Sequence, residues 1–294
     1  MSDNKTTVSL VLGSGGARGL AHIGVIRWLE DNDYRIASVS GASIGALIGG
    51  IYAAGQLDTY EKWVRAIRKI DMVSLVDISL FRGGLVKGEK IISTLRDLIG
   101  DLKIEDLPMP FTAVASDIVR EKEIWLTRGS LFDAIRASIS MPLVFTPFRV
   151  NGTHLIDGGV LNPVPIAPTF DDQNDLTIAV NLGAPPQPGA ELPPEPPSPN
   201  GAPLHEKILN FIADLGSDDE PGDGDADLLD VVNQSIDAMQ GTIARQKLAA
   251  YPPDVLIEIP RNVCGTFEYD RASALITYGY EAAARALAAR KEGV

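Results

Sequence analysis

Residues 41–45 read Gly-Ala-Ser-Ile-Gly, between an apolar run at 36–40 and a stretch of small and apolar residues that begins near Ile44. The run predicts a buried strand, and the stretch after it predicts a helix packed on a sheet. A serine on a sharp turn from strand to helix exposes its hydroxyl, and flanking glycines let neighbouring backbone come close. The pattern makes Ser43 the leading candidate for a covalent nucleophile in acyl transfer or hydrolysis.

Strands and helices alternate on both sides of this turn. Apolar runs at residues 8–12, 176–182 and 255–259 predict further buried strands, and helical spacing at 20–30 and 272–290 predicts helices between and after them. Such alternation is typical of an α/β sandwich built around one sheet rather than of separate domains.

The chain divides into three parts. We expect residues 1–183 to form a catalytic core and residues 228–294 to add helices and a strand to the same domain. Between them, residues 184–227 hold a run with nine prolines and then an acidic, glycine-containing stretch. The proline run cannot form a helix or a central strand, and the acidic stretch is expected to be mobile, so residues 184–227 are predicted to be a linker or lid.

Composition limits the partners. The chain of 294 residues has a formal net charge of −13, which argues against nucleic acid as a partner. Nine acidic residues and no lysine or arginine lie between 208 and 244, so most of the surplus belongs to one segment. The single Cys264, the absence of a signal sequence and the lack of a long apolar run predict a cytoplasmic protein.

A glycine-rich loop at residues 13–19, Gly-Ser-Gly-Gly-Ala-Arg-Gly, follows the first predicted strand. A dinucleotide site needs a third glycine where Arg18 stands, and a phosphate loop needs a Gly-Lys-Ser/Thr that is absent. What remains is a row of backbone N–H groups from Gly15 to Arg18, which suits an oxyanion on an ester carbonyl. Arg18 itself either braces the loop, meets a phosphate or is an ordinary surface cation.

Asp157, followed by two glycines, ends a hairpin predicted by the Asn-Gly pair at 151–152. A buried apolar setting raises the pKa of a carboxylate and makes it a usable base. A serine triad with a histidine base is the alternative. His205 follows in the right chain order but lies just past the proline-rich run, while His22 and His154 have weaker claims.

These elements, in this order, resemble the patatin-like phospholipases, and within them the compact bacterial branch related to neuropathy target esterase. Ser14 stands where the family commonly has a glycine. The segments that carry the resemblance are residues 12–25 (LGSGGARGLAHIGV), 41–45 (GASIG), 137–142 (ASISMP), 145–147 (FTP), 157–159 (DGG) and 162–165 (NPVP).

The resemblance implies a three-layer sandwich with a mainly parallel sheet, and a Ser43–Asp157 dyad in place of a triad. Ser43 is expected to attack an ester carbonyl while Asp157 accepts its proton, and water then releases the acyl-enzyme. No metal or cofactor is implied, and the few His and Cys residues show no metal-ligand spacing. The residues implied for the oxyanion hole and substrate binding are Gly15, Gly16, Ala17, Arg18 and Ile44.

Three functions stay open. The first is a hydrolase of (lyso)phospholipids or related acyl esters, the second an acyltransferase with the same acyl-enzyme, and the third a non-catalytic lipid-binding or regulatory protein. The intact serine, aspartate and glycine loop count against the third. An apolar stripe within 204–215 either gates acyl chains at a lipid interface or packs on the core. The few basic residues argue against strong binding to anionic membranes, so any membrane contact is expected to be transient.

Overall fold

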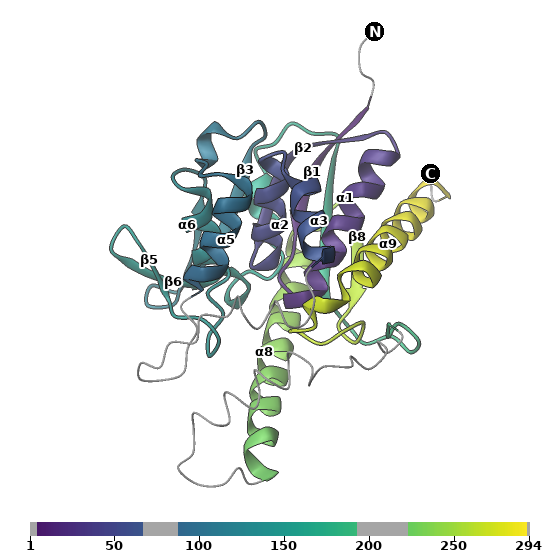
Figure 1. Cartoon of the computed structure of the whole chain (residues 1–294). Coiled ribbons are helices and arrows are strands. Elements are labelled where there is room, and N and C mark those ends of the chain that lie inside the picture. Colours follow the sequence, from purple (N-terminus) through teal and green to yellow (C-terminus); the bar gives the residue numbers. More distant parts are fainter. Residues whose placement is uncertain (1–4, 67–87, 193–222, 293–294) are drawn as a thin grey trace.

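The computed structural model describes residues 5–66, 88–192 and 223–292. In these ranges eight strands form one sheet, with the order β5-β6-β3-β2-β1-β7-β8 and with β4 paired to β3 (Figure 1). The strands are β1 (Thr6–Leu12), β2 (Tyr34–Ala42), β3 (Phe111–Asp117), β4 (Lys122–Leu126), β5 (Phe148–Val150), β6 (Thr153–Asp157), β7 (Leu176–Ala184) and β8 (Val255–Pro260).

The sheet is mostly parallel. Strands β3, β2, β1, β7 and β8 run in one direction, while β4 and β6 are antiparallel to β3 and β5 is antiparallel to β6. Strand β8 comes from the C-terminal part of the chain and pairs with β7, with Val255 beside Ile178. The C-terminal part therefore extends the same sheet.

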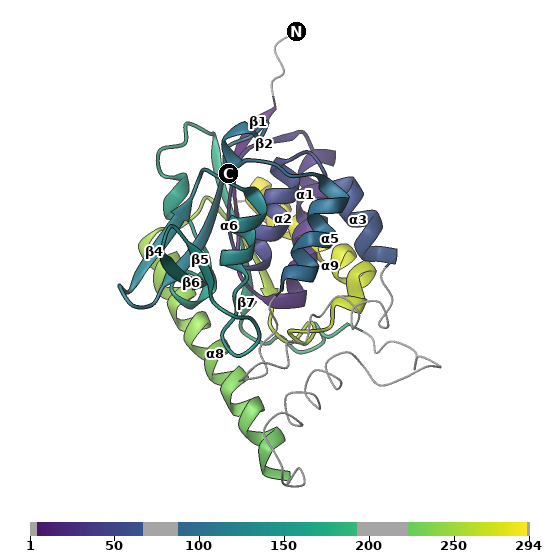
Figure 2. The same cartoon turned by 60° about the vertical axis from the view of Figure 1, so that its left-hand side comes forward.

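Helices cover both faces of the sheet (Figure 2). One face carries α1 (Ala21–Asp31), α2 (Ile44–Ala53), α3 (Leu57–Ala66), α5 (Glu89–Ile99), α6 (Leu131–Ser138) and α9 (Ala272–Glu292). The other face carries the C-terminal end of α8 (Asp223–Ala250), whose first turns extend well beyond the body of the molecule (Figure 1). No helix in the described ranges is both long enough and apolar enough to cross a membrane.

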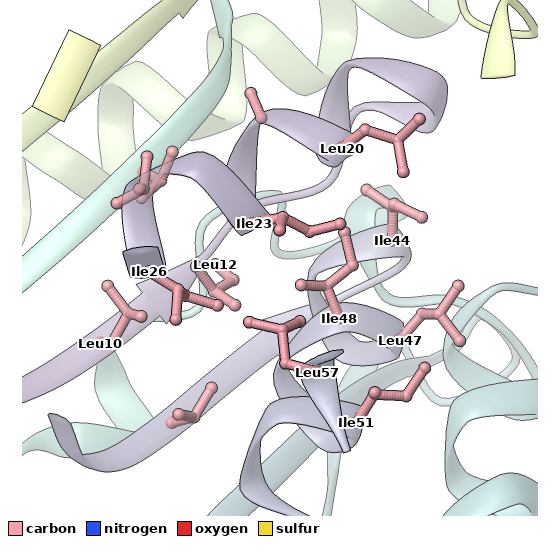
Figure 3. Close-up of a cluster of buried hydrophobic side chains, with 14 of the residues drawn as sticks. Leu10, Leu12, Leu20, Ile23, Ile26, Ile44, Leu47, Ile48, Ile51 and Leu57 are labelled. Atoms are coloured by element: carbon pink, nitrogen blue, oxygen red, sulfur yellow. The ribbon is translucent and has the colours of Figure 1, made fainter. Parts of the chain in front are cut away.

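The alternation of side chains along the central strand explains the layers. Leu10 and Leu12 point to one face and join a large cluster with Ile23 and Ile48 (Figure 3). Val11, between them, points to the other face and packs with residues of β7 and α8. The arrangement is the three-layer sandwich with a mainly parallel sheet that the resemblance implied.

The expected insertion at 184–227 differs in part from the structure. Its first residues are tied to the body, since the Leu192 N–H donates to the Val263 carbonyl at 3.2 Å. Its last residues, from Asp223 onward, belong to α8. Residues 193–222 lie outside the described ranges, and with them the apolar stripe and His205.

Candidate active site

Ser43 occupies a strained turn between β2 and α2. Its backbone angles, φ 56° and ψ −126°, lie in a region that residues other than glycine rarely adopt. The turn is tight because α2 starts directly against the end of β1. A Cβ on Gly45 would lie 2.1 Å from the carbonyl oxygen of Leu12, so only glycine fits there.

The register of β3 brings Asp157 to this turn. Ala42 pairs with Val114, and Asp157 pairs with the next residue, Ala115. Strand β4 pairs with both β3 residues along one edge of β3. The ends of β2 and β6 must therefore share the other edge, where they meet head to head. Ser43, directly after Ala42, lies at the meeting point.

The two candidate dyad side chains are hydrogen-bonded. The Ser43 hydroxyl donates to Asp157 Oδ2 at 2.5 Å, and the N–H of Gly159 donates to Asp157 Oδ1 at 2.7 Å. Asp157 is 3% exposed, and this burial raises the pKa of its carboxyl to about 6 although both hydrogen bonds lower it. The carboxylate is ionised at neutral pH and is a stronger base than an exposed aspartate.

Two serines at the end of α6 hold the backbone of the pair. The Ser138 hydroxyl accepts a hydrogen bond from the Ser43 N–H at 2.9 Å and donates to the Val114 carbonyl at 2.6 Å. The Ser140 carbonyl accepts from the Asp157 N–H at 2.9 Å. Both serines are fully buried. They lie in the stretch quoted for the resemblance, but no pattern in the sequence marks their roles.

The glycine loop is fastened to distant parts of the chain. Three of its backbone N–H groups donate to carbonyls of other segments, so the path of the loop is fixed. These bonds are Gly13 to Val180 at 3.0 Å, Ser14 to Pro163 at 2.8 Å and Ala17 to Thr266 at 2.8 Å.

These bonds correct one expectation for the oxyanion hole. The Ala17 N–H is already engaged with Thr266 and does not serve as a donor to substrate in this arrangement. Among the described residues, no acceptor lies opposite the N–H groups of Gly15 and Gly16. These two groups stay available as oxyanion donors.

Arg18 braces the loop from behind. Its side chain is buried and donates to the Gly15 carbonyl at 3.0 Å and to the Arg261 carbonyl at 3.1 Å, with Asp237 of α8 at 3.4 Å. The carbonyl and N–H of a trans peptide point in opposite directions. Because the Gly15 carbonyl faces Arg18, the Gly16 N–H points away from it. Of the readings open for Arg18, the structure shows the brace.

Ile44 presents its backbone, not its side chain, toward the turn. Its side chain is buried in the cluster with Leu20, on the core side of the turn (Figure 3). Its N–H is in the first turn of α2 and, among the described residues, meets no acceptor. The partial positive charge at a helix start favours a developing oxyanion there.

The described histidines lie away from the serine hydroxyl. His22 is fully buried with Nε2 2.9 Å from the Gly13 carbonyl, and burial lowers its pKa to about 4, so the ring is neutral and donates to the loop. His154 is exposed on β6, three residues before Asp157. Neither of these two rings hydrogen-bonds Ser43.

A C-terminal segment packs on the glycine loop through Thr266, which the sequence did not indicate. In this segment burial raises the pKa of the Tyr269 phenol, and the negative charge of Asp157 adds to the rise. In the same segment Cys264 is buried, and burial raises the pKa of its thiol to about 12. In the described ranges no group of three His, Cys, Asp or Glu residues is placed to hold a metal ion.

Comparisons with known proteins identify the family of this chain. The family described as Patatin-like phospholipase matches residues 10–170. An uncharacterized NTE family protein of Mycobacterium tuberculosis is 37% identical over an alignment of 329 residues that covers 96% of this chain and 91% of that protein.

More distant matches cover less. A lysophospholipase of Yarrowia lipolytica and a neuropathy target esterase of Drosophila melanogaster are each 32% identical, over 60% of this chain and 13% of those proteins. The crystal structure of VipD from Legionella pneumophila aligns over 97% of this chain and 67% of that chain, with a TM-score of 0.45 and 14% identity. From the family match and the M. tuberculosis relative, the chain belongs to the patatin-like phospholipase family of serine lipid acyl hydrolases, with NTE family proteins among its relatives.

Proposed function

We propose that this protein hydrolyses the carboxylic ester bonds of phospholipids, lysophospholipids or related acyl esters through a Ser43–Asp157 dyad. The observation that carries the proposal is the 2.5 Å hydrogen bond from a strained serine to a buried carboxylate whose pKa is raised to about 6. The lipid substrate class rests on the family, and the lysophospholipid on the similarity to the Yarrowia lipolytica lysophospholipase.

The first half of the reaction forms an acyl-enzyme. Ser43 Oγ attacks the ester carbonyl carbon while its proton passes to Asp157 Oδ2. The carbonyl oxygen becomes an oxyanion, which accepts hydrogen bonds from the backbone N–H groups of Gly15, Gly16 and Ile44. The tetrahedral intermediate then expels the alcohol, which takes the proton from Asp157.

Water completes the cycle. Asp157, again ionised, accepts a proton from a water molecule that attacks the acyl carbon, and the same N–H groups hold the second oxyanion. Collapse releases the fatty acid, and the proton returns from Asp157 to Ser43 Oγ. Each half of the reaction needs Asp157 ionised at its start, so kcat/KM should fall as the pH falls through about 6.

The test compares wild type, Ser43→Ala and Asp157→Asn on a short-chain p-nitrophenyl ester and on lysophosphatidylcholine. Both variants should lose at least about 10³-fold in kcat, as members of a nucleophile–base pair do. His154→Ala is the matched control, because His154 is exposed on the strand that carries Asp157, and it should keep wild-type activity. His205→Ala tests the triad.

The outcomes separate the alternatives. Activity retained by Asp157→Asn, or lost in a folded His205→Ala, would overturn the dyad. Acyl transfer to added glycerol or thiol in place of fatty-acid release would favour the acyltransferase. Lipid binding with no turnover on either substrate would favour a binding protein.

A further inference from the structure

At the point on β3 where β2 and β6 meet, the side chain of Ser138 bonds to the backbone of β3. Val114 faces Ala42, and Ala115 faces Asp157, so the peptide that joins Val114 to Ala115 lies at the junction of the two strand ends. Strand β2 pairs with Val114 but not with Ala115, and β6 pairs with Ala115 but not with Val114. Instead the Ser138 hydroxyl donates to the Val114 carbonyl at 2.6 Å.

The same hydroxyl holds the nucleophile. It accepts the Ser43 N–H at 2.9 Å, so its donor and its acceptor capacity are both used, one on β3 and one on the turn. The N–H direction fixes the peptide plane before Ser43, and with it the unusual backbone angles that aim the side chain at Asp157. Without an acceptor this buried N–H would be orphaned and the turn would be free to relax.

The other end of the segment holds the base. The Ser140 carbonyl accepts the Asp157 N–H at 2.9 Å. Ser140 is itself fixed, because its hydroxyl accepts from Arg136 Nη1 at 2.7 Å and donates to the Arg136 carbonyl at 2.8 Å. The guanidinium of Arg136 lies 5.5 Å from the ring centres of two phenylalanines, which limits its movement. Residues 138–140 therefore accept hydrogen bonds from the backbone N–H groups of both dyad members.

We propose that Ser138 is a positioning residue of the reaction. Its hydroxyl sets the backbone of Ser43 so that the nucleophile is held against Asp157 before substrate arrives. The inference rests on the proposed function, since it concerns the same dyad. The alternative is a purely structural role, in which the Ser138 hydroxyl only stabilises the fold. Removing another buried, hydrogen-bonded serine would then lower the activity by the same amount.

The test uses a pair of variants with the same shape. Ser138→Thr keeps the hydroxyl and Ser138→Val replaces it with a methyl group, while Ser138→Ala removes it without adding volume. We expect Val and Ala to lower kcat for a p-nitrophenyl ester by about 10- to 100-fold, because a small misplacement of a reacting group has effects of this order. KM should change less than about threefold. Thr should restore most of the activity.

A second measurement isolates the nucleophile. A fluorophosphonate probe bonds covalently to an activated serine, and mass spectrometry of the digested protein gives its rate of reaction with Ser43. In the Val and Ala variants this rate should fall in step with kcat. If Ser138→Ala does not fold, the Thr and Val pair decides the question, because both side chains have the same volume.

Ser40→Ala is the matched control. Ser40 is buried on β2 and donates one hydrogen bond, to the Pro165 carbonyl at 2.8 Å, without a bond to Ser43. It should lower Tm while kcat and probe labelling stay within about threefold of wild type. Equal kcat in the Thr and Val variants, or an equal loss in Ser40→Ala, overturns the inference alone. Wild type that neither hydrolyses ester nor reacts at Ser43 overturns the proposed function and the inference with it.

Discussion

The candidate dyad and the glycine loop lie side by side, yet they are supported from different parts of the chain. The backbone bonds of Ser43 and Asp157 come from β3 and residues 138–140, all inside the family match of 10–170. The loop is fastened mainly by Val180, Arg261 and Thr266, which lie beyond it. The matched segment therefore holds both candidate dyad residues, while most of the distant supports of the glycine loop lie beyond it.

The topology explains this difference. Strand β1 lies between β2 and β7, so the loop that leaves its end faces β2 on one side and the later strands on the other. The later side consists of β7 and β8, with α8 packed on β7. The short helix η5 (Tyr269–Arg271) packs on the loop's own helical turn, η1 (Gly16–Leu20). This strand order places the later part of the chain beside the loop.

Among changes outside the dyad itself, Gly16→Ala should have the largest effect, because it displaces the loop and leaves the dyad. Gly16 has φ 58°, and a Cβ there would lie 2.5 Å from the Thr266 carbonyl oxygen, so the loop must shift. Displacing an oxyanion donor should lower kcat by about 10²-fold or more. The acid limb of the pH profile should stay near pH 6, because Asp157 is untouched.

Gly55→Ala controls for backbone strain. Gly55 has a similar φ of 69°, but nothing lies within 4 Å of its Cβ position. This variant should lose about 1 kcal/mol of stability, and its kcat should equal that of wild type. If Gly16→Ala keeps kcat within threefold, the loop does not supply the oxyanion donors.

An intermediate effect is expected for Asp157→Asn on the free energy of unfolding. The folded pKa of Asp157, about 6, lies above the ordinary 3.8, so the contribution of this group to stability is fully present below pH 4 and is lost as the pH rises through 6. Asp157→Asn removes the buried charge and should be more stable than wild type at pH 8, by up to about 3 kcal/mol. Urea unfolding at pH 4 and pH 8 measures the difference, which should shrink at pH 4.

Asp175→Asn provides a contrast of opposite sign. Hydrogen bonds from Thr7 lower the pKa of Asp175, so neutralising this carboxylate should destabilise the protein at pH 8. A wild type more stable than Asp157→Asn at pH 8 would mean that the bonds from Ser43 and Gly159 outweigh the burial of the carboxylate.

The smallest effect is expected for Asp237→Asn on α8. The Asp237 side chain is 36% exposed and its contact with Arg18 is long, and such pairs contribute little. Arg18 keeps its two carbonyl partners, so kcat should stay within about threefold of wild type and the free energy of unfolding within about 1 kcal/mol. A larger loss would mean that α8 helps to hold the glycine loop in place. The loop would then depend on the C-terminal part of the chain more than its hydrogen bonds indicate.

Much of the fold follows from local patterns. The Asn-Gly pair predicted the hairpin of β5 and β6, and Asn151 and Gly152 do have the positive φ angles of a type I′ turn. The apolar runs placed the strands within a few residues, and the Gly-Ala-Ser-Ile-Gly turn does join β2 to α2. These features depend on neighbours in sequence, so the sequence carries them.

The rest depends on contacts between distant residues. No local pattern shows that β6 meets β2 head to head on β3, because this depends on strand direction and register. The buried hydroxyl of Ser138 looks like any serine near a helix end. Arg18 meets the Arg261 carbonyl across 243 positions, and the engaged N–H of Ala17 likewise depends on a residue far along the chain.

The buried thiol of Cys264 has a practical consequence. The chain contains one cysteine, and with its pKa near 12 almost no thiolate forms at neutral pH, so alkylating dyes should leave it unmodified. The native sequence should therefore stay unlabelled, so that a dye attaches only to a cysteine introduced at one chosen position. A cysteine in place of Met239, which is 57% exposed on α8, would carry a spin label or fluorophore alone. Such a label would report whether this helix changes its surroundings when the protein meets lipid vesicles.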